Sequence, residues 1–103
     1  METKQGVKRA QSATAAERST TALVRSMVDA LVDDLGAVSV SSRTNELGTH
    51  FAVRVAPTDV GKLIGKQGRT ARSMRVILGA AAMKLGTRFS LDLIEDGRQA
   101  ADV

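Results

Sequence analysis

The feature that most restricts the fold of this chain is a glycine-bracketed basic turn, Gly65-Lys66-Gln67-Gly68, which lies between two segments of helical pattern. Alternating apolar residues, typical of strands, precede and follow these segments at residues 50–56 and 88–94. Two glycines allow the backbone to turn sharply and to approach a ligand closely. The order strand, helix, turn, helix, strand predicts an α+β fold with the basic turn facing solvent.

Positive charge is concentrated around this turn. The segment from Val60 to Leu91 has seven cations and no carboxylate, within a chain of net charge +4. Three of its arginines follow at intervals of three, share roughly one helix face, and begin at a helix N-terminus, where free N–H groups and the helix dipole favour an anion. This pattern predicts contact with a nucleic-acid backbone. The seven cations are Lys62, Lys66, Arg69, Arg72, Arg75, Lys84 and Arg88.

Composition excludes several other classes of protein. A chain of 103 residues with 43% hydrophobic content fits one domain with a modest core. It has no cysteine, which excludes disulfides, thiolate nucleophiles and cysteine-based zinc sites, and its single histidine leaves little for metal or proton-transfer chemistry. The sequence has no signal-peptide pattern and no long apolar run. We therefore expect a cytoplasmic protein with no catalytic residue, metal, cofactor or membrane contact.

The rest of the chain supplies the remaining elements of one domain. Residues 1–18 are expected to form a flexible tail, residues 19–94 the domain, and residues 95–103 an acidic tail. Helical spacing predicts a first helix that starts either at the capping box of residues 14–17 or at residues 19–21, passes Leu35 and ends at Gly36. Residues 38–41 and 50–56 form a predicted hairpin around a turn at 44–48. Helices follow at 58–64 and 69–85, the second stopped by Gly86, before a last strand.

The string Val60-Gly61-Lys62-Leu63-Ile64-Gly65-Lys66-Gln67-Gly68-Arg69, with strands and helices around it, resembles the core of a KH domain. The order α-β-β-α-α-β, with Val55-Ala56-Pro57 before the string and Ala80-Ala81-Ala82 after it, resembles the type II arrangement of small bacterial single-KH-domain RNA-binding proteins. The resemblance covers roughly residues 20–94. It implies a three-stranded mixed sheet with helices packed on one face.

Function and site residues also follow from this resemblance. It makes Gly65, Lys66, Gln67 and Gly68 a clamp on the backbone of single-stranded RNA, with Arg69 and Arg72 as phosphate contacts and Lys62 flanking them. It further implies a role as an RNA chaperone or post-transcriptional regulator linked to cell envelope growth and cell shape. The implied protein partners are a second copy of the chain or a larger KH-containing protein.

Other functions have weaker support from the residues. A phosphate-binding NTPase loop would need a wider glycine spacing, a hydroxyl in place of Gln67, and a strand before the loop. Modules that stack bases on rings are disfavoured because Phe51 and Phe89 both fall on apolar strand faces. Val60, Leu63 and Ile64 are expected in the core rather than in contact with bases. The alternatives that remain are a protein-interaction module with a vestigial loop, and binding of single-stranded DNA.

Overall fold

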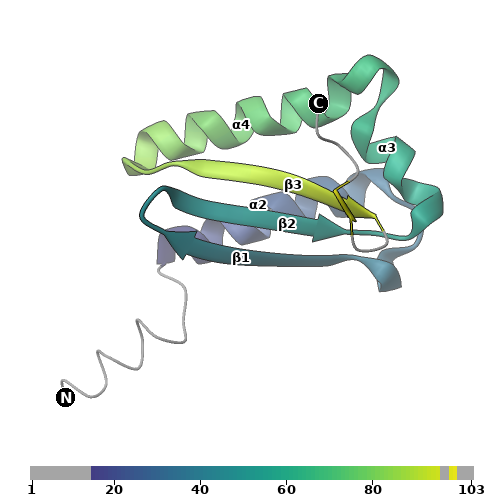
Figure 1. Ribbon diagram of the computed structural model, residues 1–103, viewed down its shortest axis with the longest axis horizontal. Helices are drawn as coiled ribbons and strands as arrows, with labels where there is room; N and C mark the ends of the chain where they lie inside the picture. The colour runs from purple at the N-terminus through teal and green to yellow at the C-terminus, as the bar shows by residue number, and fades with distance from the viewer. Residues whose placement is uncertain (1–14, 96–97, 100–103) are drawn as a thin grey trace.

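The structure, a computed structural model, describes residues 15–95 and 98–99. Its main elements are helix α2 (Ala15–Leu31), strands β1 (Ser39–Asn45) and β2 (Gly48–Arg54), helices α3 (Val60–Ile64) and α4 (Arg69–Leu85), and strand β3 (Phe89–Glu95) (Figure 1). Short 3-10 turns lie at Leu35–Ala37, Pro57–Asp59 and Lys66–Gly68, and a two-residue strand, β4 (Arg98–Gln99), follows β3. The predicted α-β-β-α-α-β order and the α+β class are confirmed.

The three long strands form the predicted mixed sheet. β1 and β2 are antiparallel, β2 and β3 are parallel, and α3 and α4 form the crossover that a parallel pair requires. The hairpin is tighter than predicted because Asn45 pairs with Gly48, which leaves Glu46 and Leu47 as the turn. The Asn45 side-chain oxygen accepts the Leu47 N–H at 2.7 Å and so stabilises this short turn.

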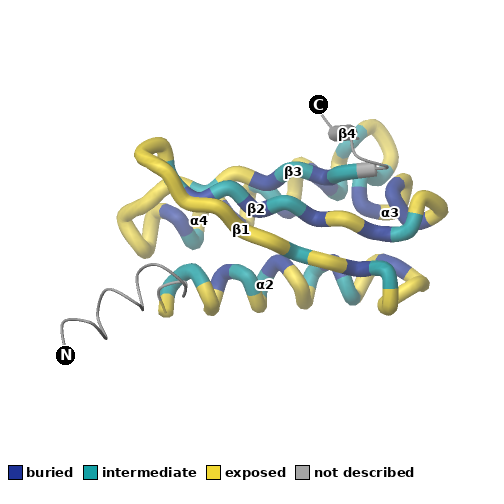
Figure 2. The backbone as a smooth tube through the Cα atoms, turned by 60° about the horizontal axis from the view of Figure 1, so that its bottom comes forward, coloured by how far each residue is buried: buried dark blue, intermediate teal, exposed yellow. Residues whose placement is uncertain are grey.

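The helices pack on one face of this sheet and the core lies between the two layers (Figures 1 and 2). On β2, Thr49, Phe51 and Val53 are buried and alternate with more exposed residues, as expected for a strand with one covered face. The Phe51 and Phe89 rings meet edge to face with centroids 5.3 Å apart. The other main core residues are Val24 and Val28 of α2, Leu63 of α3, Ala71, Met74 and Leu78 of α4, and Leu91 and Leu93 of β3.

The first helix starts and ends differently from the pattern in the sequence. It starts at Ala15, which agrees with the earlier of the two predicted starts. It ends at Leu31 rather than beyond Leu35, because the buried carboxylate of Asp59 accepts the N–H groups of Asp33 at 3.2 Å and Asp34 at 3.0 Å. The predicted end at Gly36 is therefore wrong, and Gly36 lies within the short turn that follows.

The last helix gives one confirmation and one correction, and a short strand follows near the chain end. Gly86 has φ 70° and ψ 34°, and the carbonyls of Ala82 and Met83 accept its N–H, so the helix stops where predicted. The helical spacing of Ala71, Met74, Leu78, Ala81 and Leu85 predicts a core stripe on α4, but the buried stripe ends on Ala82 and Leu85 is 40% exposed. In the stretch expected to be a tail, β4 pairs with the end of β3 through Ile94 with Gln99 and Glu95 with Arg98. Residues 1–14, 96–97 and 100–103 lie outside the described residues, so the tails stay a prediction.

Candidate nucleic-acid interface

The turn between α3 and α4 has a backbone that favours glycine at its ends. Gly65 has φ 78° and ψ 170°, Gln67 has φ 57° and ψ 28°, and Gly68 has φ 73° and ψ 13°. A Cβ on Gly65 would lie 2.7 Å from the backbone nitrogen of Thr70 and 2.6 Å from its Cβ. The loop therefore folds back closely onto the first turn of α4, and a side chain at Gly65 would prevent this approach.

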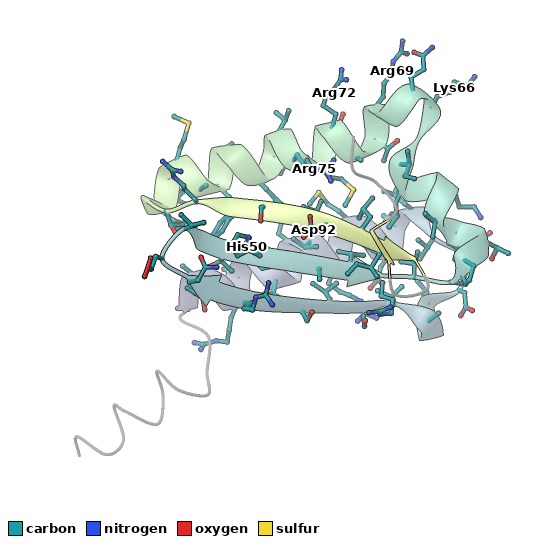
Figure 3. All side chains as sticks on the ribbon, viewed as in Figure 1. His50, Lys66, Arg69, Arg72, Arg75 and Asp92 are labelled. Atoms are coloured by element: carbon teal, nitrogen blue, oxygen red, sulfur yellow. The ribbon has the colours of Figure 1, made fainter. Side chains whose placement is uncertain are left out.

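The two residues between the glycines lie on the surface with two nearby arginines. Lys66, Gln67, Arg69 and Arg72 are all exposed, and Figure 3 shows Lys66, Arg69 and Arg72 pointing away from the body of the protein at one corner. No side-chain hydrogen bond caps the N-terminus of α4. This corner thus combines exposed cations with the N-terminal end of a 17-residue helix, an arrangement that favours an anion.

Lys62 lies in a different environment from the loop cations. Its ammonium group is 2.8 Å from the Asp59 carboxylate and 3.2 Å from that of Asp33. The hydrogen bond to Asp59, followed by that to Asp33, raises the pKa of Lys62. The hydrogen bond from Lys62, with the N–H groups of Asp34 and Asp33, lowers the pKa of Asp59. Lys62 thus holds α3 to the end of α2, and its role as a phosphate contact stays a prediction.

Arg75 is separated from the arginines with which the sequence groups it. Its Nε and a terminal guanidinium nitrogen donate to the carbonyl oxygen of Leu91 at 3.3 and 2.9 Å. Arg75 is half-buried, whereas Arg69 and Arg72 are exposed. The interval of three therefore does not place all three side chains on one solvent face, and Arg75 connects α4 to β3.

The apolar residues next to the loop lie in the core, as predicted, and His50 lies elsewhere. Val60 and Leu63 are buried, and Ile64 is partly buried against the core, so the expectation of core positions is confirmed. His50 lies on the face of the sheet away from the helices, where its ring nitrogens are 2.6 Å from the Ser90 hydroxyl and 3.3 Å from the Asn45 side-chain oxygen. This geometry gives His50 a structural partner on each side.

The role of Asp59 was not predicted from the sequence. Asp59 positions α3, the helix that precedes the loop, without contacting the loop itself. Its carboxylate, 1% exposed, joins the residues after α2 to Lys62. The available signal was the spacing of three between Asp59 and Lys62, which places both charges on one side of a helical turn. Among the described residues, no group of three acidic or histidine side chains could hold a metal ion. Within the same residues, no helix is long and apolar enough to cross a membrane.

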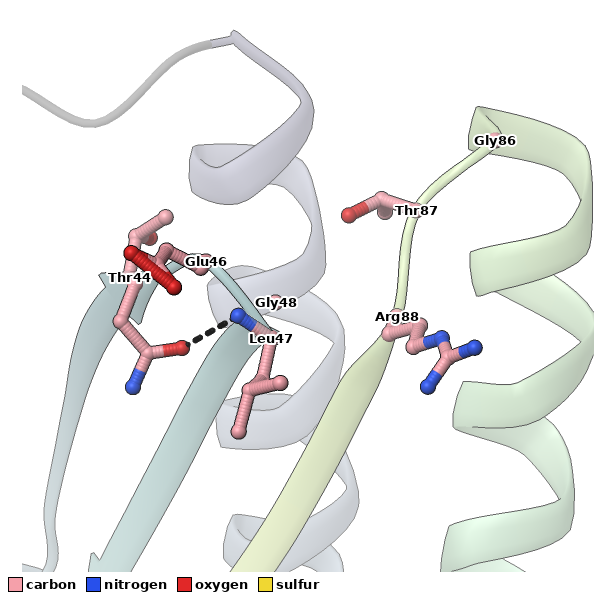
Figure 4. Close-up of a pocket in the computed structure, with 8 residues that line it drawn as sticks. Thr44, Glu46, Leu47, Gly48, Gly86, Thr87 and Arg88 are labelled. Atoms are coloured by element: carbon pink, nitrogen blue, oxygen red, sulfur yellow. Dashed lines mark hydrogen bonds between the residues drawn. The ribbon is translucent and has the colours of Figure 1, made fainter.

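A shallow hollow of about 500 Å³ lies at the end of the sheet where the hairpin turn meets the loop after α4 (Figure 4). It is bordered by Glu46 and Leu47 on one side and by Thr87 and Arg88 on the other. Gly48 forms part of its floor, and a Cβ there would lie 2.5 Å from the Arg88 carbonyl oxygen. This close approach joins the start of β2 to the start of β3, where Thr49 N–H donates to the same oxygen at 2.9 Å.

Two helices joined by a G-x-x-G turn, within an α-β-β-α-α-β chain on a mixed sheet, define a KH domain of type II. The family model described as "KhpA/KhpB, KH domain" matches residues 21–93. The chain therefore belongs to the KhpA/KhpB KH-domain family.

Individual relatives agree with this assignment. The RNA-binding protein KhpA of Halalkalibacterium halodurans is 44% identical over 73 residues, which cover 71% of this chain and 96% of the relative. The RNA-binding protein KhpA of Treponema pallidum is 42% identical over 73 residues, 71% of this chain and 91% of the relative. That of Streptomyces coelicolor is 41% identical over 69 residues, 67% of this chain and 84% of the relative.

Proposed function

We propose that this protein binds single-stranded RNA and holds its backbone at the Gly65–Gly68 loop. The observation that carries this proposal is the exposed corner at the start of α4, where Lys66, Arg69 and Arg72 surround a loop whose backbone is open to a ligand. The relatives named as RNA-binding proteins support RNA as the nucleic acid.

Each residue of the corner has a distinct role in this proposal. Gly65 and Gly68 allow the sugar-phosphate chain to approach the loop backbone, and their own N–H groups donate to the carbonyls of Gly61 and Gly65. The N–H groups of Lys66 and Gln67, with the Gln67 side chain, then donate to phosphate oxygens. Lys66, Arg69 and Arg72 neutralise phosphates, and Lys62 flanks them from its ion pair with Asp59. A few such contacts predict a salt slope of roughly −0.7 each for a single strand.

A double substitution at the loop tests this site. Lys66→Asp with Gln67→Asp places two carboxylates where phosphates would lie and is expected to abolish RNA binding. Stability should change little, because both side chains are exposed and aspartate tolerates the left-handed backbone of position 67. The measurement is fluorescence anisotropy with labelled mixed-sequence oligoribonucleotides, accompanied by thermal melts.

A matched control variant separates the effect of the loop site on RNA affinity from the effect of net charge. Lys84→Asp with Thr87→Asp makes the same change in charge at exposed positions near the other end of α4. This control should keep most of the RNA affinity. Equal affinity of the loop variant and the parent would refute the site, and equal loss in both variants would leave net charge as the cause. Tighter binding of the matching single-stranded DNA would favour the alternative ligand.

The same binding supports a role as an RNA chaperone or post-transcriptional regulator in the cytoplasm, without catalytic turnover. Transient, sequence-tolerant contact with the phosphate chain lets a protein release strands after they rearrange. Annealing of complementary oligoribonucleotides should be faster with the parent than with the loop variant. A link to cell envelope growth and cell shape predicts that cells producing the loop variant in place of the parent differ in length or width.

A second surface supports pairing with another copy or with a larger KH-containing protein. The outer side of α4 exposes Val76 by 66%, Ile77 by 45% and Met83 by 84%, although such side chains are more often buried. Val76→Glu with Met83→Glu should reduce association in sedimentation experiments and leave the melting temperature nearly unchanged. A monomeric parent, together with no retention of a co-purified KH partner, would contradict this pairing.

A further inference from the structure

The outer edge of β1 is an exposed feature separate from the loop and from the outer side of α4 (Figure 1). In the strand order β1-β2-β3-β4, β1 is terminal, and no strand of the described residues pairs with its outer edge. β1 is seven residues long, contains no proline, and has six exposed residues, and Figure 2 shows it exposed along most of its length above α2. Short length and proline both keep an edge strand from pairing with another strand. A long edge without proline can therefore add a further strand.

The direction of the backbone groups can be assigned along this edge. The Thr49 N–H donates to the carbonyl oxygen of Arg88 on the β3 side. The β2 residues on either side of Thr49 in alternation therefore direct their backbone N–H and C=O groups toward β1. Among these, His50 is opposite Arg43, and Ala52 is opposite Ser41. The alternate β1 residues therefore direct their N–H and C=O groups outward. These residues are Val40, Ser42 and Thr44.

A hollow lies beside two of these residues, Val40 and Ser42. Its volume is about 540 Å³, and it is lined by Val40 and Ser42 of β1 and by Arg18, Thr21, Ala22 and Arg25 of α2. Residues paired across two strands place their side chains on the same face of the sheet. A segment paired with Val40 and Ser42 would thus place its alternate side chains over this hollow, against Ala22 and the Val40 methyl groups.

The charge of the hollow restricts the occupant. Arg18 and Arg25 are both exposed beside the hollow. Arg25 donates to the partly exposed carboxylate of Asp29 at 2.9 Å, an i,i+4 pair that an incoming carboxylate can exchange at small cost. A second copy paired through this edge would bring the same arginines of both chains together, which disfavours it. An acidic occupant avoids the repulsion between these arginines.

We propose that the β1 edge and the hollow beside it bind an extended segment of a partner protein, with apolar side chains at alternate positions and acidic residues at its ends. The segment adds to the sheet as a strand antiparallel or parallel to β1, and its backbone forms hydrogen bonds with Val40, Ser42 and Thr44. Its apolar side chains cover the hollow. Its carboxylates contact Arg18 and Arg25. This surface is distinct from the loop and goes beyond the proposed RNA binding. The chain then carries RNA at the loop between α3 and α4 and protein at the β1 edge.

The probe for this site is a short synthetic peptide with valine at alternate positions, threonine between them and aspartate at both ends. Titration into the full-length protein is followed by NMR. We expect shifts concentrated at the amides of Val40, Ser42 and Thr44, and slower solvent exchange of these three amides. A peptide with lysine ends should bind at least tenfold more weakly.

Two variants identify the contacts. Ser42→Pro removes an outward N–H on which no pairing of β1 with β2 depends, so the fold is kept while the edge is blocked. Arg18→Glu with Arg25→Glu reverses the charge beside the hollow and leaves the edge intact. Both should lose at least tenfold in peptide affinity, and both should keep the RNA affinity of the parent, so the result is independent of the loop.

Four outcomes would overturn the proposal. One is the absence of shifts at millimolar peptide. A second is equal affinity for the aspartate-ended and lysine-ended peptides. A third is movement of the same amides by oligoribonucleotide instead of peptide, which would assign the hollow to RNA. The last is movement of these amides with protein concentration alone, which would assign the edge to a second copy.

Discussion

Gly65→Ala is the substitution for which the structure gives the clearest magnitude. The backbone at Gly65, with φ 78° and ψ 170°, lies in a region that is essentially restricted to glycine and costs other residues about 1–3 kcal/mol. The added methyl group would also lie 2.7 Å from the Thr70 backbone nitrogen, which cannot rotate away, so overpacking adds about 1–3 kcal/mol. We expect a total loss of about 2–6 kcal/mol.

Urea unfolding measures this loss against a matched control. Domains of this size have a free energy of unfolding of about 5–15 kcal/mol, and each kcal/mol lost lowers the melting temperature by about 4–8 °C. Gly61→Ala is the control, because Gly61 lies in α3, four residues earlier, with nothing within 4 Å of an added Cβ. This control should be neutral or stabilising by up to about 1 kcal/mol. The m-value should stay constant in both variants.

The same pair of variants separates the geometry of the loop from its charge. Gly65→Ala keeps every cation of the corner but moves the loop away from α4, so we expect its RNA affinity to fall even where the protein is fully folded. Gly61→Ala should bind as the parent does. A Gly65→Ala protein within about 0.5 kcal/mol of the parent, a change typical of plain surface positions, would refute the account of the loop.

Three further predictions concern single residues. Asp59→Asn should lower the melting temperature at neutral pH. The folded pKa of Asp59 lies below its ordinary value of 3.8, so the stabilisation by its carboxylate is present above pH 3.8 and is lost as the pH falls through the folded pKa. A difference in melting temperature from the parent that persists in acid would contradict this prediction. Arg69→Ala and Arg72→Ala should each reduce the salt slope of RNA binding by about 0.7, as measured by anisotropy across a salt series, whereas an unchanged slope would remove that arginine from the phosphate contacts. Gln67→Asn should raise the free energy of unfolding by about 0.5 kcal/mol, because asparagine adopts the left-handed backbone of this position more readily, and a destabilised variant would show that the Gln67 side chain supports the loop.

The parts of the fold that depend on local chemistry were predictable from the sequence. Gly86 ends α4 because a left-handed residue is needed where the last carbonyls accept its N–H, and this requirement is visible in one glycine after a helical pattern. The strands followed from alternation, since β2 has one buried and one exposed face. The loop itself was also found, because its two glycines and Lys66 are contiguous in the sequence.

The parts that depend on distant residues were not predictable. α2 ends at Leu31 because Asp59, about 25 residues later in the chain, accepts the N–H groups that would continue the helix. Arg75 leaves the solvent face because the Leu91 carbonyl lies within its reach. The acid-free segment begins at Val60, and Asp59, the residue immediately before it, is the carboxylate that holds Lys62. Counting charge along the chain could not reveal this pairing in space.

These pairings limit how tightly one copy of the chain can hold RNA. Of the cations nearest the loop, Lys62 and Arg75 bind groups of the protein itself, and Lys66, Arg69 and Arg72 have no ion pair within the described residues. Three phosphate contacts predict a salt slope of about −2, which corresponds to weak binding at physiological salt. A second attachment would therefore raise the affinity. A partner held at the β1 edge or at the outer side of α4 would supply it by raising the effective concentration of the loop near RNA, without any new contact at the loop.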